Sequence, residues 1–399
     1  MEKNRDKIET SRDKKILERI LKASGDPKLL KVLTQKISMR DLQSLLLNVY
    51  RDRVDQIRIY DVIRQYQENR FVQPCDISQK EFLMLDHLAY SILPEEFVPI
   101  ELSPVNPLGL NKVLTKISQN TILSTVRNIE VIADVGTALT LEYMRRRELL
   151  TGALKGNVSI NLCASQRVIR LQQFTKESGF TPHFRILALC TGGKDTGYES
   201  FKIETVTKHI AFYLDLLRLL NENGYRTIEI NVAFADIRII ENMIQYFHVD
   251  REEVMRNTQN PLFRPFKLYS IELPEAVNNL SEITSQDVKR YQIKKSISLL
   301  TKAQEKALKP LNIKHPNVNF RFDLERVAGI GYYQDLCFKI TAKNSKGQEF
   351  PLVDGGFLDW AQKLLTDQRE KLLISGFGSE LFCRNFKEEK EAPISLKQS

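Results

Sequence analysis

Two β-rich runs separated by a loop of about ten residues are the feature that most constrains how this chain folds. The runs are Ser165–Gln172 (SQRVIRLQ) and His183–Cys190 (HFRILALC), and the loop between them contains glycine and proline. This pattern predicts a long-looped β-hairpin. The hairpin carries Arg167, Arg170 and Arg185, and a guanidinium group matches the oxygens of a phosphate or a carboxylate. The residues therefore predict either an anion-binding hairpin or a sheet face whose arginines are solvated.

The composition is that of a globular protein with a buried core. Of the 399 residues, 42% are hydrophobic and 27% are charged, and this length suits roughly two or three domains. The apolar runs are far shorter than the ~18 residues that a membrane helix needs, so we expect no membrane span. The N-terminal segment MEKNRDKIETSRDKK is charged where a secretion signal is apolar, so we expect a cytoplasmic protein.

The cysteines and histidines show no spacing that is typical of a metal site or a disulfide framework. The sequence has no CxxC pair, no histidine next to a cysteine, and no HxH or HExxH pattern. We therefore expect buried free thiols and no metal ion. The residues concerned are Cys75, Cys163, Cys190, Cys337, Cys383, His87, His183, His209, His248 and His315.

The N-terminal part is basic and has a helical pattern. Residues 1–75 contain 17 lysines and arginines against 11 aspartates and glutamates, which contributes +6 to the net charge of +9. Apolar residues recur there at three- and four-residue spacing, so we expect a small all-α domain. Its charge favours contact with a polyanion such as RNA or tRNA, whereas the interspersed acids favour a solvated face with i,i+4 ion pairs.

The rest of the chain mixes strands and helices. Ser78–Leu93 is an expected helix with Glu81 three residues after Ser78, which is the capping-box arrangement. A second helix, Thr137–Leu149, ends in Arg145–Arg147, where cations suit the helix dipole. The other expected elements are the strands Phe97–Val105, Asn128–Ala133, Arg226–Phe234, Asn319–Leu324, Leu336–Thr341, Glu349–Val353 and Lys371–Ile374, the helices Tyr198–Asn223, Ala235–Phe247 and Asp359–Leu365, and a closing helix.

Glycine pairs and polar segments set the expected boundaries. We expect Gly192–Gly193 to interrupt the secondary structure between the hairpin and the long helix that follows. We expect Gly355–Gly356 to begin a short helix. The polar, helical segment 249–315 interrupts the strand pattern and is expected to be an insertion. The predicted domains are a basic helical domain at 1–75, a core in two parts at 76–248 and 316–388, the helical insertion, and a tail at 389–399.

In this order the elements resemble the core of a class II aminoacyl-tRNA synthetase of the histidyl-tRNA synthetase-like branch. The helix and strand up to Pro104 resemble motif 1, the dimerisation element, and the arginine hairpin resembles motif 2. Further similar segments are IADVGTA (132–138), AGIGYY (328–333), DGGFLD (354–359) and GFGSEL (376–381), of which the last resembles motif 3. The resemblance implies an α+β fold in which a mostly antiparallel sheet is flanked by helices.

The resemblance also implies a ligand site. Arg170 stands where the family has the arginine that grips the α-phosphate of ATP, so it is the predicted catalytic residue. ATP is the implied cofactor, with Mg²⁺ if the chain is catalytic. The predicted ligand-binding residues are Arg167, Gln172, Arg185, Asp134, Thr137, Tyr332, Tyr333 and Glu380.

Several positions that are charged in the family are changed in this chain. Val135 replaces the glutamate that holds the substrate's amino group, Ala328 replaces an arginine of the histidyl signature, and Leu381 replaces the arginine that clamps the γ-phosphate. One such arginine typically contributes about 3 kcal/mol of transition-state stabilisation, so ordinary histidylation is not expected. Arg384 and Arg326 are the candidates to replace the missing cation.

Three functions follow from the sequence. The first is a non-aminoacylating regulatory or binding subunit that binds a nucleotide and/or an amino acid, like the family's synthetase-like partner of ATP phosphoribosyltransferase. The second is an ATP-dependent ligase that activates a carboxylate other than histidine through an acyl-adenylate. The third is an RNA-binding protein that uses residues 1–75. We also expect a homodimer through residues 78–104, and for the first function a partner enzyme.

Overall fold

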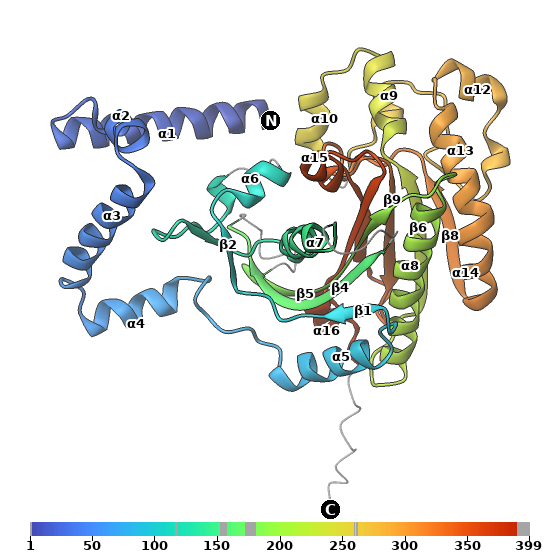
Figure 1. Ribbon diagram of the computed structural model, residues 1–399, viewed down its shortest axis with the longest axis horizontal. Coiled ribbons are helices and arrows are strands. Elements are labelled where there is room, and N and C mark those ends of the chain that lie inside the picture. Colours follow the sequence, from blue (N-terminus) through green and yellow to red (C-terminus); the bar gives the residue numbers. More distant parts are fainter. Residues whose placement is uncertain are drawn as a thin grey trace, which may run out of the picture. The chain divides into compact units, whose positions relative to one another are not determined.

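The computed structural model describes residues 2–115, 119–151, 158–171, 181–258, 260 and 262–388. It divides the chain into two compact units (Figure 1). Residues 1–73 and 124–130 form one unit, and the other unit comprises residues 74–123 and 131–399.

The first unit is built from short helical pieces. Ser38 begins α3 because its hydroxyl accepts a hydrogen bond from the backbone N–H of Asp41. No residue of α2, α3 or α4 is buried, and the structure describes every residue of these three helices. The helical elements are α1 (Glu2–Ser24), α2 (Leu29–Lys31), a π-helical turn (Val32–Lys36), α3 (Met39–Val54) and α4 (Ile59–Glu68).

The second unit is built on a large mixed sheet, so the chain is α+β. Among the described residues the sheet has nine strands, in the order β1-β4-β5-β11-β10-β9-β6-β8-β7. Only β1–β4 and β6–β8 are parallel, and the other neighbouring pairs are antiparallel. The nine strands are β1 (Phe97–Pro99), β4 (Ile160–Ile169), β5 (His183–Lys194), β6 (Glu229–Asp236), β7 (Ala276–Val277), β8 (Val318–Asp323), β9 (Leu336–Lys343), β10 (Glu349–Leu358) and β11 (Glu370–Phe377).

A separate two-stranded sheet pairs β2 (Val105–Pro107) with β3 (Ile129–Val131). The strand predicted at Asn128–Ala133 is therefore shorter than expected and lies outside the large sheet.

The helices of this part of the chain are α5 (Gln79–Ser91), α6 (Leu110–Thr115), α7 (Val135–Thr151), α8 (Ser200–Asn221), α9 (Arg238–Tyr246), α10 (Arg251–Asn257), α11 (Pro265–Leu268), α12 (Ser285–Arg290), α13 (Lys294–Ala303), α14 (Lys309–Lys314), α15 (Trp360–Leu365) and α16 (Ser379–Phe386).

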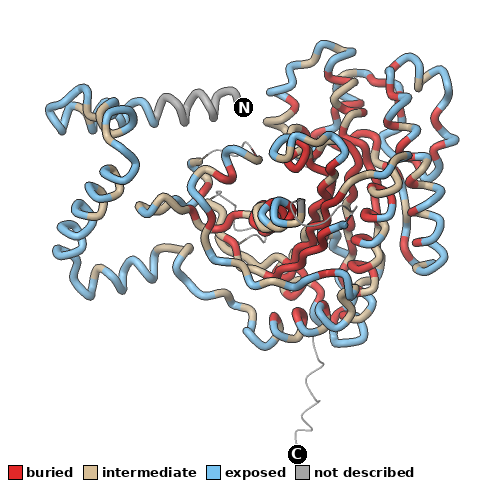
Figure 2. The backbone as a smooth tube through the Cα atoms, viewed as in Figure 1, coloured by how far each residue is buried: buried red, intermediate tan, exposed pale blue. Residues whose placement is uncertain are grey.

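Helices α7 and α8 cover opposite faces of the sheet. Gly192 of β5 lies beneath the ring of Tyr143 in α7, so close that an added Cβ would come within 2.2 Å of the ring. The neighbouring Thr191 hydrogen-bonds His209 of α8 at 2.9 Å. Because successive side chains of a strand point to opposite faces, the sheet has an α7 face and an α8 face. Buried residues follow the strands between these layers (Figure 2).

Both glycine pairs lie inside strands, which corrects two expectations from the sequence. Strand β5 continues through Gly192 and Gly193 to Lys194, and β10 includes Gly355 and Gly356. A Cβ at Gly356 would lie 2.6 Å from the ring of Tyr333. These glycines are explained by close packing of aromatic rings onto the sheet, not by turns.

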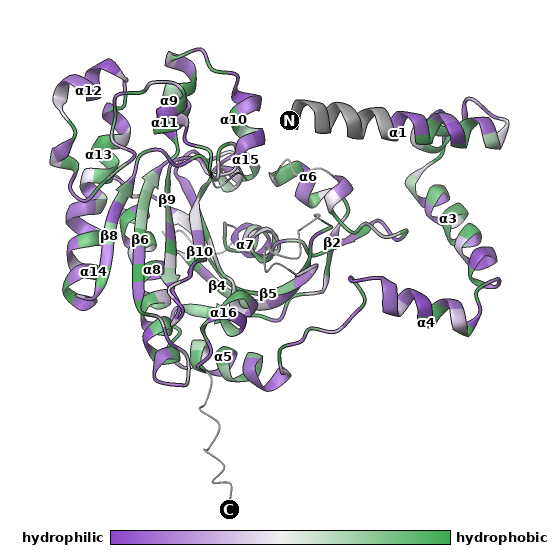
Figure 3. Ribbon diagram, turned by 180° about the vertical axis from the view of Figure 1, so that it is seen from behind, coloured by the Kyte–Doolittle hydropathy of each residue, from purple (hydrophilic) through white to green (hydrophobic). Residues whose placement is uncertain are grey.

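The polar segment predicted as an insertion connects the parallel strands β6 and β8 and contributes to the core. A parallel pair cannot be joined by a tight turn and needs a long crossover, which helices α9 to α14 supply here. Leu299 and Leu300 of α13 are buried in the main core. Hydrophilic and hydrophobic stretches alternate along α13 and α14 (Figure 3), as expected of helices with one buried face.

The arginine triplet does not end its helix, which corrects the interpretation based on the helix dipole. Helix α7 continues to Thr151, and Arg145 and Arg146 pair with Glu142 of the preceding turn. Arg147 is buried and forms an ion pair of 2.7 Å with the buried Glu370 of β11.

Two more groups complete the contact between α7 and the sheet. The hydroxyl of Tyr143 donates to the second carboxylate oxygen of Glu370 at 2.9 Å. Nε and Nη2 of Arg147 donate to Glu370, and Nη1 donates to the carbonyl of Val158 at 3.0 Å. Burial raises the pKa of Tyr143, and the nearby Glu370 carboxylate raises it further, so the phenol stays a donor.

In the part of the chain that the structure describes, no helix is long and apolar enough to cross a membrane.

Replacement of Arg147 tests this buried network. We expect Arg147→Met to lower the free energy of unfolding by about 3 kcal/mol, because Glu370 would lose its close partner and keep only Tyr143 and Lys194, whose Nζ lies 4.0 Å away. Arg145→Met is the matched control, since Arg145 is exposed on the same helix, and it should change stability little. Urea unfolding followed by circular dichroism measures both. Equal effects of the two variants would contradict the role given to Arg147.

A buried histidine makes stability depend on pH. Nε2 of His209 lies 2.9 Å from the hydroxyl of Thr191, and its Nδ1 lies 2.8 Å from the hydroxyl of Ser375. Burial lowers the pKa of His209 to about 3, and the nearby Lys208 lowers it further. The ring is therefore neutral in the folded protein at neutral pH.

The depressed pKa of His209 predicts loss of stability in acid. In the unfolded chain the histidine takes up a proton as the pH falls below about 6.5, whereas in the folded protein it does so only near pH 3. Between these values the free energy of unfolding should fall by up to about 1.4 kcal/mol per pH unit because of this residue. His209→Gln should show a shallower fall between pH 6 and pH 5, while replacement of the exposed His87 should keep the wild-type slope. Parallel slopes for wild type and His209→Gln would refute the assignment.

Candidate functional site

Arg167 and Arg185 lie opposite each other on β4 and β5 and point to the α8 face. The two residues are partners in the strand register, and both guanidinium groups approach the ring of Phe82 in α5, at 5.4 and 5.9 Å. Arg185 pairs with Asp86 of α5 at 2.6 Å, and Arg167 pairs with Glu380 of α16 at 2.8 Å. These two arginines therefore join the hairpin to α5 and α16.

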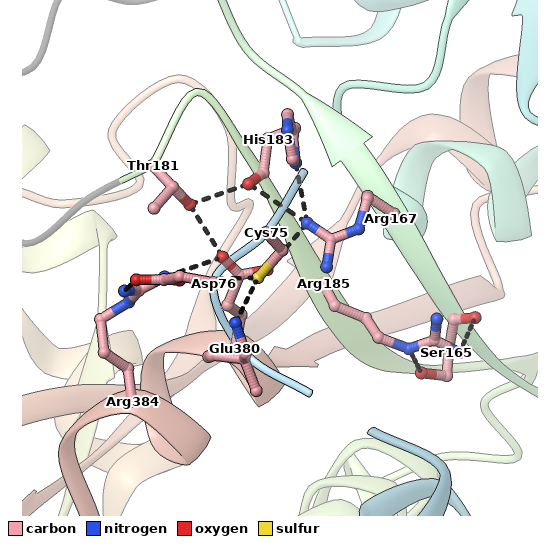
Figure 4. A network of polar contacts seen from close by, with 10 residues as sticks. Cys75, Asp76, Ser165, Arg167, Thr181, His183, Arg185, Glu380 and Arg384 are labelled. Atoms are coloured by element: carbon pink, nitrogen blue, oxygen red, sulfur yellow. Dashed lines mark hydrogen bonds and ion pairs between the residues drawn. The ribbon is translucent and has the colours of Figure 1, made fainter. Parts of the chain in front are cut away.

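The contacts around Glu380 form a closed network (Figure 4). Glu380 is buried and receives a hydrogen bond of 3.1 Å from the hydroxyl of Thr181. Arg384 of the same helix donates to Glu380 at 3.3 Å and holds Asp76 at 2.5 and 2.6 Å. The hydrogen bond from Arg384 lowers the pKa of Asp76 despite partial burial. Burial raises the pKa of the adjacent Cys75, so its thiol is a poor nucleophile.

Arg170 lies on the opposite face from the other two arginines. It follows the last residue of β4, and its guanidinium group stacks over Phe184 at 5.2 Å. Phe184 neighbours Arg185 in β5, so it points to the α7 face. The three arginines predicted to bind one anion are thus divided between the two faces. This corrects the hypothesis of a single anion site on the hairpin.

Arg170 holds the beginning of α7. Its Nε donates to the carbonyl of Ala133 at 2.7 Å, and one terminal nitrogen pairs with Asp134 at 3.0 Å. The other oxygen of Asp134 accepts the backbone N–H of Thr137 at 3.2 Å, as at a helix N-terminus. The buried Thr137 donates its hydroxyl to the carbonyl of Asp134. Thr137, predicted to bind ligand, therefore shapes the turn, whereas Asp134 and Arg170 are both partly exposed.

Two tyrosines and a second ion pair lie near Arg170 on the α7 face. Asp354 of β10 accepts hydrogen bonds from the hydroxyl of Tyr333 and from Arg326, the latter at 2.7 Å. The ring of Tyr332 packs edge-on against that of Tyr333 at 5.0 Å. Burial raises the pKa of Tyr332, and the negative charge of Asp134 raises it further. Burial likewise raises the pKa of Tyr333, with Asp354 as the next cause. Both phenols are therefore donors at any physiological pH.

We call the group of Asp134, Arg170, Tyr332, Tyr333, Asp354 and Arg326 the α7-face cluster. The structure brings together four predicted site residues here: Asp134, Arg170, Tyr332 and Tyr333. It places Arg167, Arg185 and Glu380 on the other face, and Gln172 lies outside the described residues. Asp354 was not predicted as a site residue, although its position in DGGFLD, after two tyrosines in AGIGYY, is the signal that could have identified it.

Of the two candidate replacements for the arginine missing at Leu381, only Arg326 belongs to the α7-face cluster, and its Nη1 has no hydrogen-bond partner among the described residues. Leu381 is partly buried and packs against the core. Arg384, one turn later, is held by Asp76 and Glu380 on the α8 face. Arg326 is buried, and it donates to the carbonyl of Ala328 at 2.9 Å and to Asp354. Burial alone lowers the pKa of Arg326, but the Asp354 carboxylate raises it above the ordinary value, so the pair stays ionised.

The α7-face cluster offers two carboxylate–guanidinium pairs. Asp134 and Arg170 lie 3.0 Å apart, with side chains 26% and 31% exposed, and Asp354 and Arg326 lie 2.7 Å apart. The hydroxyl of Tyr333 donates to Asp354. These groups can orient a small polar ligand. Among the described residues no group of three or more histidines, cysteines and acids is arranged to hold a metal ion.

A mixed sheet with this cluster on one face, between a motif 2-like hairpin and a motif 3-like helix, has the architecture of a class II aminoacyl-tRNA synthetase core. More narrowly, the fold is that of the histidyl-tRNA synthetase-like branch. An ATP phosphoribosyltransferase regulatory subunit/histidyl-tRNA synthetase from Bacillus halodurans C matches with a TM-score of 0.56 and 16% identity, over 78% of this chain and 82% of that one. Histidyl-tRNA synthetase from Nostoc sp. PCC 7120 matches with a TM-score of 0.56 and 12% identity, over 78% of this chain and 73% of that one.

These matches confirm the predicted resemblance at the level of the fold. No protein-family model and no curated protein sequence matches the chain. The low identities agree with a divergent sequence on a shared architecture.

Two replacements of Asp134 separate its contributions. We expect Asp134→Ala to lower the free energy of unfolding by about 1–2 kcal/mol, because it removes the acceptor at the beginning of α7. Asp134→Asn keeps an acceptor and loses only a partly exposed ion pair, so it should cost less than about 1 kcal/mol. Urea unfolding measures both values. If asparagine is as destabilising as alanine, the capping role is wrong.

Proposed function

We propose that this chain is a synthetase-like protein that does not aminoacylate and acts as a binding or regulatory subunit. The observation that carries the proposal is that no free arginine among the described residues stands at the clamp position, and that the two candidate replacements form ion pairs. Leu381 stands where the family has the arginine that clamps the γ-phosphate. Arg384 pairs with Asp76, and Arg326 pairs with Asp354. Loss of one such cation typically costs about 3 kcal/mol of transition-state stabilisation, and the glutamate for the amino group is replaced by Val135.

The proposed ligand is an amino acid and/or a nucleotide, bound at the α7-face cluster. Arg170 would hold a carboxylate or an α-phosphate, and Asp134 would hold an amino group. In the structure these two side chains pair with each other, and both are partly exposed. An ion pair of this exposure contributes about 1 kcal/mol or less, so a ligand that offers both charges can replace it.

The proposal includes three kinds of partner: another enzyme, a second copy of this chain, and RNA. The Bacillus halodurans protein is described as an ATP phosphoribosyltransferase regulatory subunit/histidyl-tRNA synthetase, and by analogy with the first of these we propose a partner enzyme for this chain. A homodimer through residues 78–104 is supported by β1, an edge strand of the sheet with an open side. Contact with RNA through residues 1–75 remains a prediction from charge.

A specific observation favours the ligase as the second candidate. Arg170 is retained and accessible, and in the family this arginine grips the α-phosphate during acyl-adenylate formation. Under this alternative ATP binds with Mg²⁺, and a carboxylic acid other than histidine accepts the adenylyl group with release of pyrophosphate.

Calorimetry with ATP and with a panel of amino acids tests the site. We expect at least one of these ligands to bind, and Arg170→Ala to weaken that binding by about tenfold or more, because a charge-assisted contact is lost. Arg369→Ala is the control, since Arg369 is exposed and pairs only with the neighbouring Asp367 in the structure. No binding by the wild type, or equal binding by Arg170→Ala, would refute the proposed site.

Pyrophosphate exchange separates the two functions on the same protein. The regulatory proposal predicts no ATP–pyrophosphate exchange with histidine or with any other carboxylic acid in a screen. Exchange that depends on one particular acid, and that Arg170→Ala abolishes, would replace the proposal with the ligase.

A further inference from the structure

A polar cavity lies at the beginning of α8, away from the α7-face cluster. It has a volume of about 220 Å³ and is lined by residues of β4, β5, the loop after β5 and the first turns of α8. Thr191 is one of its lining residues and points to the α8 face, where it bonds His209. The cavity is therefore on the opposite side of the sheet from Arg170 and independent of the function proposed above.

Two buried polar side chains in this cavity have no protein partner. Asn161 of β4 is 6% exposed and Thr205 of α8 is 4% exposed, and both line the cavity. Among the described residues neither side chain makes a hydrogen bond. Their polar atoms still reach solvent within the cavity, since neither residue is among those whose side-chain polar atoms are fully enclosed without a partner. An amide and a hydroxyl that both open into one cavity are therefore available to hydrogen-bond a ligand in place of water.

The charges around the cavity are mostly positive. Lys194 and Lys208 line it, each paired at about 3 Å with a carboxylate that lies outside the lining, and Glu204 is the only acid among the lining residues. A second cavity of about 310 Å³ shares Ser200, Glu204 and Lys208 with the first.

The second cavity adds two further lysines. Lys302 of α13 and Lys306 of the following π-helical turn (Gln304–Leu308) line it, and neither forms an ion pair with any described residue. The N-terminus of α8, a helix of 22 residues, also begins at Ser200 in the wall shared by the two cavities. The N–H of Ser200 donates to the carbonyl of Gly197, so the helix dipole and the N–H groups of the next two residues are what favours an anion at this point.

We propose that this double cavity binds a small phosphorylated metabolite. The lysines and the N-terminus of α8 would hold the phosphate, while Asn161 and Thr205 would hydrogen-bond hydroxyl or amide groups on the body of the ligand. The two cavities, of about 220 and 310 Å³, share part of their wall, which leaves room for a phosphate and a short polar body.

Equilibrium dialysis of the full chain against radiolabelled inorganic phosphate, at constant ionic strength, tests this site. We expect saturable uptake by the wild type, and affinity about fivefold or more lower in Lys208→Gln and Thr205→Val, because each loses one contact. Thr205→Val nearly preserves the shape of the side chain, so the fold should survive, and urea unfolding checks this. Lys289→Gln is the control, since Lys289 is exposed on α12 and does not line either cavity.

The possible outcomes are distinct from those for the α7-face cluster, which is tested through Arg170. Absence of saturable phosphate uptake up to concentrations on the order of 10 mM would overturn the proposal. So would unchanged affinity in both Lys208→Gln and Thr205→Val. Loss of affinity in these two variants with retention in Lys289→Gln would support it, whatever the result with ATP.

Discussion

The buried pair of Arg147 and Glu370 is the interaction on which the arrangement of the second unit depends. It fixes the middle of α7 to the central strand β11, and Tyr143 adds a hydrogen bond to the same carboxylate. The beginning of this helix carries Asp134, which faces Arg170 from the hairpin. The distance between these two partly exposed groups is therefore set by contacts that lie about three turns along the helix. The side chains at the end of a helix are positioned accurately only if packing holds that helix in place.

The sheet separates two kinds of charged contact. On the α8 face, Arg167 and Arg185 are used to join the hairpin to α16 and α5 through Glu380 and Asp86. On the α7 face, Arg147 and Glu370 form a buried pair and Arg326 is also buried, whereas Asp134 and Arg170 are partly exposed. The same hairpin thus supports the structure on one side and a candidate site on the other. In the motif 3-like segment, Leu381 stands where the resemblance leads one to expect the clamping arginine.

Much of the fold could be predicted from the sequence, because strand and helix patterns are local. The hairpin, the capped helix after Ser78 and the succession of late strands rest on short-range periodicity. The face that each arginine occupies could not be predicted, because it depends on where β4 ends and on which helix covers it. The glycines of β5 and β10 misled the prediction for a related reason. Only the tertiary contacts show that these glycines, which have no side chain, allow the rings of Tyr143 and Tyr333 to pack onto the strands. Of the site, Asp134 and Arg170 were predictable from the family-like motifs, but Asp354 and the ion pairs of Arg384 and Arg326 required coordinates.

The strand order has a consequence for how the chain acquires its structure. Strand β5 pairs with β11, whose residues 370–377 are made long after residues 183–194. During synthesis β5 therefore has only β4 as a neighbour, and its apolar side chains and unpaired backbone groups are exposed on the other side. Contacts of such long sequence separation slow folding and leave time for association with other chains. Completion of the sheet waits for its C-terminal strand, so a chain that loses β11 would lack the centre of the sheet and not merely its end.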